Sequence, residues 1–305
     1  MANVIAVIWD FDKTLVDGYM QDPIFTEYGV DAGAFWREVN ALPERYRKEQ
    51  GVKVNPDTIY LNQFIRSAKQ GVFPGLDNAR LRSFGAKLRF YPGVPEIFPL
   101  TKAICADDPE YQKYEIKVEH YIVSTGMSEI IKGSAVYGEV DGIWGCELIE
   151  EPAGAQGENV ISEIAYTIDN TTKTRAIFEI NKGANVHPEI DVNAAMPEES
   201  RRVPFKNMIY IADGPSDVPA FSVVRGNGGA TFAIYPKGDV RAFRQVEALR
   251  ESGRIDTYAE ADYREGSMSY MWISAKIREF ADRITREERE RIRRSVKGVP
   301  QHLNV

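Results

Sequence analysis

The sequence contains few of the residues that build disulfide frameworks, zinc sites or serine and cysteine hydrolases. Its 305 residues include two cysteines and three histidines. Cys105 and Cys146 are too few for a framework of disulfides, and no cysteine and histidine cluster has zinc-site spacing. His120, His187 and His302 show no pairing with a serine or cysteine nucleophile. A reducing compartment fits this composition best.

Long apolar runs and an excess of positive charge are also missing. No stretch approaches the roughly 20 apolar residues that span a bilayer. The first apolar run, Val4 to Trp9, has no basic segment before it and meets Asp10 and Asp12 directly, unlike a signal peptide. The net charge is −7, so no basic field attracts polyanions. We therefore expect a cytoplasmic protein that binds neither nucleic acid nor membranes.

Four short apolar runs, each followed by small or acidic residues, are the main structural signal. The runs are Val4 to Trp9, His120 to Val123, Met208 to Ala212 and Thr231 to Tyr235. Continuous apolarity is typical of strands buried on both faces of a parallel sheet, and helix-like segments separate these runs. The pattern predicts an α/β, doubly wound parallel-sheet (Rossmann-like) core, in which ligands lie beyond the carboxyl ends of the strands.

The stretch between the first and second runs has a different character. Three segments show helical spacing of apolar residues: Asp31 to Gln50, Pro56 to Gln70 and Asp77 to Phe90. We interpret residues 18–89 as a smaller helical domain inserted into the core, which would comprise residues 1–17 and 90–305. A length of 305 residues agrees with about two domains.

Other segments give weaker signals. Tyr137 to Leu148 alternates around Asp141-Gly142, which predicts a small antiparallel hairpin. Residues 185–206 are typical of a loop. Lys276 to Lys297 mixes arginine and glutamate at helical spacing, which favours a solvated surface helix over a helix that binds a partner.

Carboxylates and one lysine stand where the predicted strands and helices meet. Asp10 and Asp12 follow the first run, and Asp213 and Asp217 follow the third, with Gly214-Pro215 turning the chain between them. Lys173 falls in the first turn of a predicted helix, where a cation is electrostatically unfavourable. Each feature alone is also consistent with an acidic turn or a solvent-facing lysine.

The second run is followed by Ser124-Thr125-Gly126, which enters a helix-like segment. A hydroxyl and free backbone N–H groups at a helix start can bind a phosphate, although simple N-capping explains the same residues. Gly226 to Gly229 lacks a full dinucleotide fingerprint and precedes a strand, so we interpret it as a turn.

The order of these motifs resembles the haloacid dehalogenase (HAD) superfamily of phosphohydrolases. Asp-x-Asp-x-Thr, Ser-Thr-Gly, a lysine heading a helix and Asp-Gly-x-x-Asp occur in sequence, and the helical insert looks like the cap of the phosphoserine-phosphatase type. The resemblance implies that Asp10 is the nucleophile and that Asp12 is the general acid and base. It also implies that Lys173 neutralises the phosphate and Asp10.

The same resemblance assigns a phosphate seat and a metal site. Ser124, with the amides near Thr125 and Gly126, would bind the transferring phosphoryl oxygens. Asp10 and Asp213 would bind a metal through side chains, Asp12 through its carbonyl, and Asp217 in or just outside the first shell. One lysine cannot balance four carboxylates and a phosphate, and all-oxygen ligands indicate Mg²⁺.

We therefore predict a magnesium-dependent phosphomonoester hydrolase for a small phosphorylated metabolite, acting through an aspartyl-phosphate. The second aspartate argues against a dehalogenase, which has no leaving alkoxide to protonate. Tyr19 stands where the phosphoserine enzymes have a glutamate, so phosphoserine itself is unsupported, and Ser216 replaces a frequent asparagine. The alternatives are a phosphotransferase, a phosphonate hydrolase, or a catalytically weak binding or regulatory protein. Neither the physiological ester nor the oligomeric state follows from the sequence.

Overall fold

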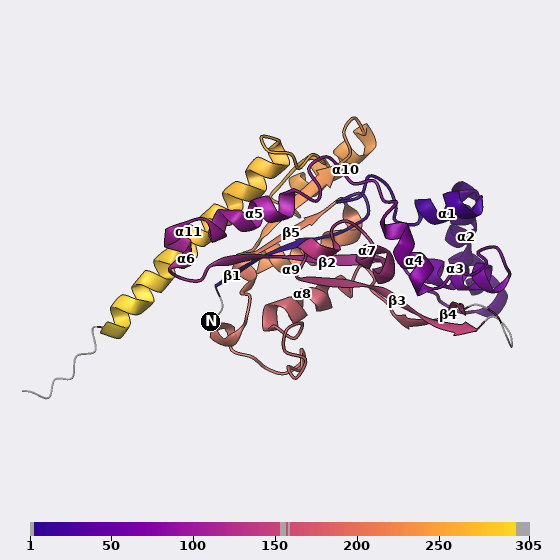
Figure 1. The fold of residues 1–305 in the computed structure, drawn as a ribbon, viewed down its shortest axis with the longest axis horizontal. Helices are drawn as coiled ribbons and strands as arrows, with labels where there is room; N and C mark the ends of the chain where they lie inside the picture. The colour runs from indigo at the N-terminus through magenta and orange to yellow at the C-terminus, as the bar shows by residue number, and fades with distance from the viewer. Residues whose placement is uncertain (1–2, 153–156, 158, 297–305) are drawn as a thin grey trace, which may run out of the picture.

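A seven-stranded sheet forms the centre of the molecule, in the order β4-β3-β2-β1-β5-β6-β7 (Figure 1). The structure is a computed structural model that describes residues 3–152, 157 and 159–296. The strands are β1 (Val4–Trp9), β2 (Lys117–Met127), β3 (Gly142–Pro152), β4 (Asn159–Tyr166), β5 (Met208–Ala212), β6 (Ala230–Tyr235) and β7 (Thr257–Glu260). All neighbouring pairs are parallel except β3 and β4. The predicted α/β core is confirmed.

Helices cover both faces of the sheet, because alternate side chains of β1 enter two separate cores. Ile5, Val7 and Trp9 pack with α5 (Ile97–Ala106) and with the first half of α11 (Met268–Val296). Ala6 and Ile8 pack on the opposite face. That face is covered by α8 (Lys173–Lys182), α9 (Val218–Gly226) and α10 (Val240–Glu251).

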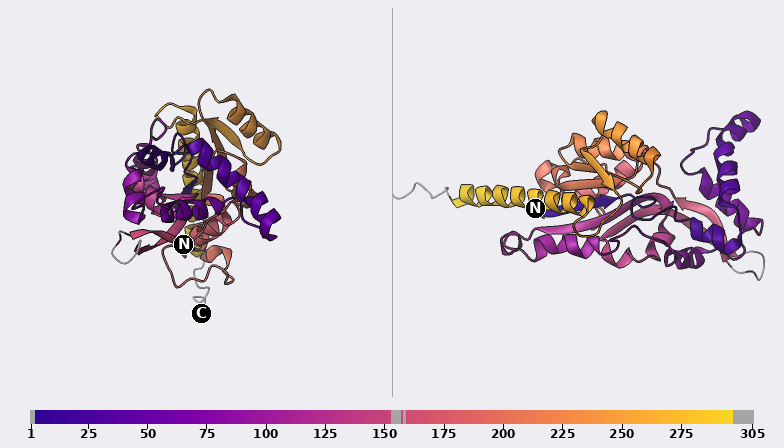
Figure 2. Two further views of the ribbon diagram at one scale, coloured as in Figure 1. Left: turned by 90° about the vertical axis from the view of Figure 1, so that its right-hand side faces the viewer. Right: turned by 90° about the horizontal axis from the view of Figure 1, so that it is seen from above.

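The first four helices after β1 gather at one end of the molecule, beside the outer parts of β3 and β4 (Figures 1 and 2). They are α1 (Asp22–Tyr28), α2 (Ala32–Gln50), α3 (Ile59–Lys69) and α4 (Asn78–Gly85). Their interior is aromatic, with Phe25, Phe35, Phe64 and Phe73 in mutual ring contact. The second half of α11 extends from the opposite end (Figure 2). None of the helices in the described ranges has the length and apolarity that crossing a membrane requires.

His120 has a structural role in the core. Trp9 Nε1 donates to His120 Nδ1 at 3.1 Å, and Thr101 Oγ1 lies 2.9 Å from His120 Nε2. Burial lowers the pKa of His120 to about 3, so the ring is neutral at physiological pH. This network joins β1, just before Asp10, to β2 and α5.

The hairpin predicted around Asp141-Gly142 is wrong. The Asp141 carboxylate accepts from the His120 amide at 2.8 Å, and the Asp141 amide donates to the His120 carbonyl at 2.7 Å. These bonds hold the turn against β2, so the chain continues as β3 parallel to β2. The hairpin that does form is β3–β4, and neither β4 nor β7 was predicted.

Two helix predictions also need correction. The helix expected over Asp77 to Phe90 ends at Gly85, and Phe90 forms an isolated bridge with Val16. The charged C-terminal helix begins at Met268 and is not wholly solvated, because Ile277, Phe280 and Ile284 are buried. The predicted end of that helix, residue 297, lies outside the described residues.

The inserted helices contact the sheet domain backbone to backbone where α4 meets α7 (Ser128–Lys132). A Cβ added to Gly133, which follows α7, would lie 1.7 Å from the Arg82 carbonyl oxygen. A Cβ on Gly85 would lie 2.3 Å from the Ile130 carbonyl oxygen. Only glycine permits so close an approach at these two positions.

We predict that Gly133→Ala lowers the free energy of unfolding by about 1–3 kcal/mol, because overpacking forces the two backbones apart. Chemical denaturation followed by circular dichroism measures the change. Gly138→Ala is the matched control, since nothing lies within 4 Å of a Cβ there. Equal stability of the two variants would contradict the close packing of α4 on α7.

Candidate active site

The carboxyl ends of β1, β2 and β5 meet at one edge of the sheet. Trp9 at the end of β1 is paired with Ile122 in β2 and with Ile211 in β5. Asp10 follows Trp9, and its amide donates to the Ile211 carbonyl at 2.9 Å. The register therefore brings the first, second and third motifs to the same edge, as parallel strands require.

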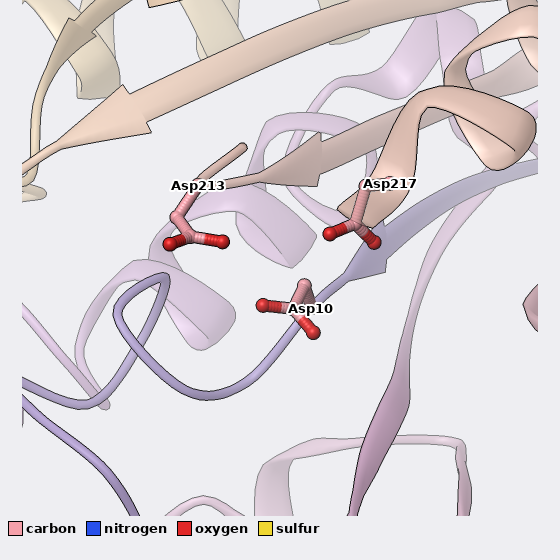
Figure 3. Close-up of side chains that lie close together, drawn as sticks. All are labelled: Asp10, Asp213 and Asp217. Carbon is pink, nitrogen blue, oxygen red and sulfur yellow. The ribbon is translucent and has the colours of Figure 1, made fainter. Parts of the chain in front are cut away.

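Three aspartates form a compact cluster at this edge. Asp10, Asp213 and Asp217 each offer a carboxylate oxygen, and these oxygens lie within 4.8 Å of one another. Figure 3 shows the three carboxyl groups converging from the end of β1 and from the turn after β5. Asp10 and Asp217 are buried, whereas Asp213 is partly accessible. The turn through Gly214 and Pro215 allows two carboxylates four residues apart to approach one point.

Lys173 lies inside the cluster at the start of α8. Its side chain is 2% exposed, and Nζ donates to Asp10 Oδ1 and to Asp217 Oδ1, both at 2.7 Å. The two carboxylates raise the pKa of Lys173 although its burial opposes this, so the lysine is charged. Lys182, the other lysine of α8, instead donates to the Val192 and Ala194 carbonyls.

Hydroxyl groups also bond to the carboxylates of Asp10 and Asp217. Thr14 Oγ1 donates to Asp10 Oδ2 at 3.1 Å. Tyr210 OH donates to Asp217 Oδ1 at 2.6 Å, and Ser216 Oγ donates to Asp217 Oδ2 at 2.9 Å. Sequence reasoning missed Tyr210, because a tyrosine within an apolar strand carries no signal that distinguishes it from a core residue.

Asp12 lies next to the cluster, and its carboxylate is bonded to Met20, a residue of the inserted segment. The Met20 amide donates to Asp12 Oδ1 at 2.9 Å. Burial, followed by the neighbouring Asp10 charge, raises the pKa of Asp12 well above its usual value. A carboxyl group with a raised pKa can be protonated at the start of a reaction and donate that proton.

Asp213 is the least compensated carboxylate of the group. Within the described part of the chain its side chain accepts no hydrogen bond. Burial and the charges of Asp10 and Asp217 raise its pKa to about 7. A buried set of carboxylate oxygens with one lysine suits a hard divalent cation, which takes oxygen ligands and offsets their mutual repulsion. The cluster can therefore hold Mg²⁺.

The second motif lies within β2 and not in a turn after it. Ser124 Oγ accepts from the Gly126 amide at 3.0 Å, and the Thr125 carbonyl accepts from Tyr60 OH at 2.7 Å. Met20 packs on Gly126, where a Cβ would lie 2.1 Å from the methionine Cε. Among the described residues, no hydrogen bond joins Ser124 to the aspartates.

Residues of the inserted segment therefore contact two of the motifs. Tyr60 of α3 reaches the second motif, and Met20 contacts both the first and the second. Asn55, before α3, donates to Asp169 at 2.9 Å, four residues before Lys173. Sequence reasoning missed these contacts, because they join positions that are distant in the sequence.

Comparison with known proteins identifies one relative by sequence. No family model matches the chain. A protein of Borreliella burgdorferi, described as uncharacterized, is 38% identical over 291 residues, which cover 90% of this chain and 97% of that protein. The chain belongs to one family with that protein.

Solved structures with the same topology include HAD enzymes. A HAD family hydrolase of Salmonella enterica serovar Typhi matches with a TM-score of 0.50 and 16% identity, over 85% of this chain and 67% of that one. The chain has the haloacid dehalogenase fold. This is the fold that the resemblance of the four motifs implies. An apo phosphoserine phosphatase matches with a TM-score of 0.49 and 14% identity, over 86% and 96% of the two chains.

We predict that removing one carboxylate stabilises the protein when no metal is bound, because it reduces the repulsion among the clustered aspartates. The pKa of Asp213 rises from 3.8 to about 7 on folding, so its contribution to stability is present at low pH and lost as the pH rises through that range. Without metal, Asp213→Asn should melt about 2–4 °C above wild type at pH 7.5, with a smaller difference at pH 5.

Differential scanning fluorimetry with EDTA and with Mg²⁺ measures both effects. Mg²⁺ should stabilise wild type and have little effect on Asp213→Asn. Asp107→Asn is the control, because Asp107 is exposed and distant in sequence from the cluster. Equal Mg²⁺ responses in wild type and Asp213→Asn would contradict a cation site at this edge.

Proposed function

We propose that this HAD protein is a magnesium-dependent phosphomonoester hydrolase for a small phosphorylated metabolite, acting through an aspartyl-phosphate on Asp10. The main support is the burial of Lys173 between Asp10 and Asp217, beside the carboxylate of Asp213. A net charge of −7 agrees with a small substrate and not a nucleic acid. We place the enzyme in the cytoplasm, as expected from a sequence with no signal peptide and no membrane span.

Asp10 is the nucleophile in this proposal. Its carboxylate oxygen forms a bond to phosphorus while the bond between phosphorus and the alcohol oxygen breaks. Lys173 and Thr14 hold the two oxygens of Asp10, so little reorganisation is needed to aim the group. The resulting acyl phosphate divides one difficult displacement into two easier steps.

Asp12 moves the protons of both steps. It first gives its proton to the departing alcohol oxygen, and its raised pKa keeps that proton available. As a carboxylate it then takes a proton from water, whose oxygen attacks the phosphorus and releases phosphate from Asp10. Asp12 is protonated again at the end, so the proton balance closes.

The metal site would use the side chains of Asp10 and Asp213 and the backbone carbonyl of Asp12, with Asp217 in or just outside the first shell. When bound, Mg²⁺ would supply charge neutralisation and a fixed orientation for the phosphate. Lys173 would neutralise charge on the phosphate and on Asp10. Ser124 and the amides near Thr125 and Gly126 remain the proposed seat of the phosphoryl oxygens.

Residues 18–89 would act as a cap that excludes water. Support comes from contacts of Met20 and Tyr60 with the second motif and of Asn55 with the loop before α8. The ring of Trp36 in α2 contacts the rings of both Tyr19 and Tyr60, which joins the start of the insert to α3. Exclusion of water strengthens the electrostatic interactions of the cluster.

We predict that Asp10→Asn reduces turnover of p-nitrophenyl phosphate at least about 10⁴-fold, because an amide cannot form the acyl phosphate. Release of p-nitrophenol in the presence of Mg²⁺ is the measurement, with Asp107→Asn as the control. Adding an alcohol acceptor and analysing the products distinguishes hydrolysis from transfer. Turnover of Asp10→Asn at the wild-type rate would exclude this nucleophile.

Lys173→Ala should reduce kcat/KM by roughly 10²- to 10³-fold, as expected for loss of an electrostatic stabiliser. Lys182→Ala on the same helix is the matched control and should retain activity. Because removing one partner of a buried ion pair destabilises a fold by about 3–5 kcal/mol, circular dichroism must show a folded variant. A folded Lys173→Ala enzyme with full activity would contradict the assigned role.

A further inference from the structure

A polar cavity lies beside the acidic cluster and shares Asp213 with it. It has a volume of about 460 Å³ and extends from Asp213 toward α10. Lys13, Tyr19 and Tyr91 line one side, and Arg241 and Gln245 of α10 line the other. Because Asp213 belongs to the proposed metal site, this cavity begins where the phosphate ester would be bound.

Two of the three acidic residues of this cavity bond to other groups. Asp17 pairs with Arg89 at 2.8 Å. The Asp239 carboxylate caps α10 by accepting from the amides of Arg241 and Ala242 at 3.0 and 2.9 Å. Asp213 lies beside the like charges of Asp10 and Asp217, and the charges of Lys173 and Lys13 attract it.

Its two cations, Lys13 and Arg241, are held less closely, although the charges of Asp213 and Asp12 attract Lys13. Lys13 Nζ lies 4.3 Å from the centroid of the Tyr19 ring, and Arg241 is exposed on the first turn of α10. Within the part of the chain that the structure describes, neither forms an ion pair within 4.0 Å. Two unpaired cations and the Gln245 amide therefore face one cavity that also reaches Asp213.

We propose that this cavity binds a second anionic group, a carboxylate or a second phosphate, on the alcohol part of the substrate. The inference rests on the proposed phosphatase function and narrows its substrate class to phosphate esters that carry another negative charge. Arg241 offers a planar pair of N–H donors that matches such a group, and Lys13 adds a point charge. Tyr19 and Tyr91 would contact the carbon skeleton between the two anions.

In this proposal, residues of α10 as well as the inserted segment determine which substrate binds. It also accounts for the difference at Tyr19, since a cavity with Lys13 and Arg241 in its walls has no need for a glutamate that would pair with a substrate ammonium. The ligand is thus an anionic metabolite and not a phosphorylated amine.

The test compares three matched series of esters of increasing chain length: ω-carboxyalkyl phosphates, alkanediol bisphosphates and ω-hydroxyalkyl phosphates. Wild type with Mg²⁺ should prefer an ester with the second anion at the best length by about tenfold or more in kcat/KM. Arg241→Gln should reduce that preference about tenfold, whereas Arg244→Gln, one turn further along α10, should keep it. The two anionic series distinguish carboxylate from phosphate recognition.

A binding measurement separates this inference from the proposed chemistry. Isothermal titration with ω-carboxyalkyl and ω-hydroxyalkyl phosphonates, which resist hydrolysis, reports recognition without turnover. Turnover of all three series at similar kcat/KM, or an equal effect of Arg241→Gln on all of them, would overturn the subsite and leave the phosphatase intact. An absence of hydrolysis together with an Arg241-dependent preference for the carboxylate would reject the phosphatase and support the subsite.

Discussion

The placement of one buried lysine determines the arrangement of the candidate site. Lys173 joins the end of β1, through Asp10, to the turn after β5, through Asp217. A lysine and two carboxylates removed from water are costly unless each finds its partner, so the three groups hold one another in place. Tyr210 and Thr14 complete the set of bonds. The uncompensated charge that remains, centred on Asp213, is what makes a bound cation favourable.

The sheet provides the rigid support for this arrangement. β1 is buried on both faces, and its alternate side chains belong to two cores, so its end can move little. Trp9, the last residue of β1, is fixed by its bond to His120. The nucleophile of the proposed reaction is thus the first residue after the best-anchored strand of the molecule. Rigid placement of this kind is what a reaction based on orientation requires.

Much of this could be predicted from the sequence, because continuous apolar runs and short motifs are local signals. The bounds of β1 and β5 agree with the predicted runs, and Lys173 begins α8 as expected. The direction of β3 could not be predicted, since it depends on Asp141 bonding to β2. Tyr210, Tyr60 and Met20 were missed because their roles arise from tertiary contacts. The cavity at Arg241 was likewise invisible, since Lys13 and Arg241 are more than two hundred positions apart.

The direct backbone contact between α4 and α7 affects how a ligand would reach the cluster. Gly85 and Gly133 leave no space between these helices, and the Ile161 amide of β4 bonds to the Leu76 carbonyl beside α4 at 2.8 Å. The insert is therefore fastened to the sheet at two places, which opposes a hinge-like swing of the whole insert. The opening next to Asp213 provides a side entrance that needs no such movement. The rates of substrate binding and product release would then depend on the width of that entrance and on the side chains of Tyr19 and Arg241, which line it.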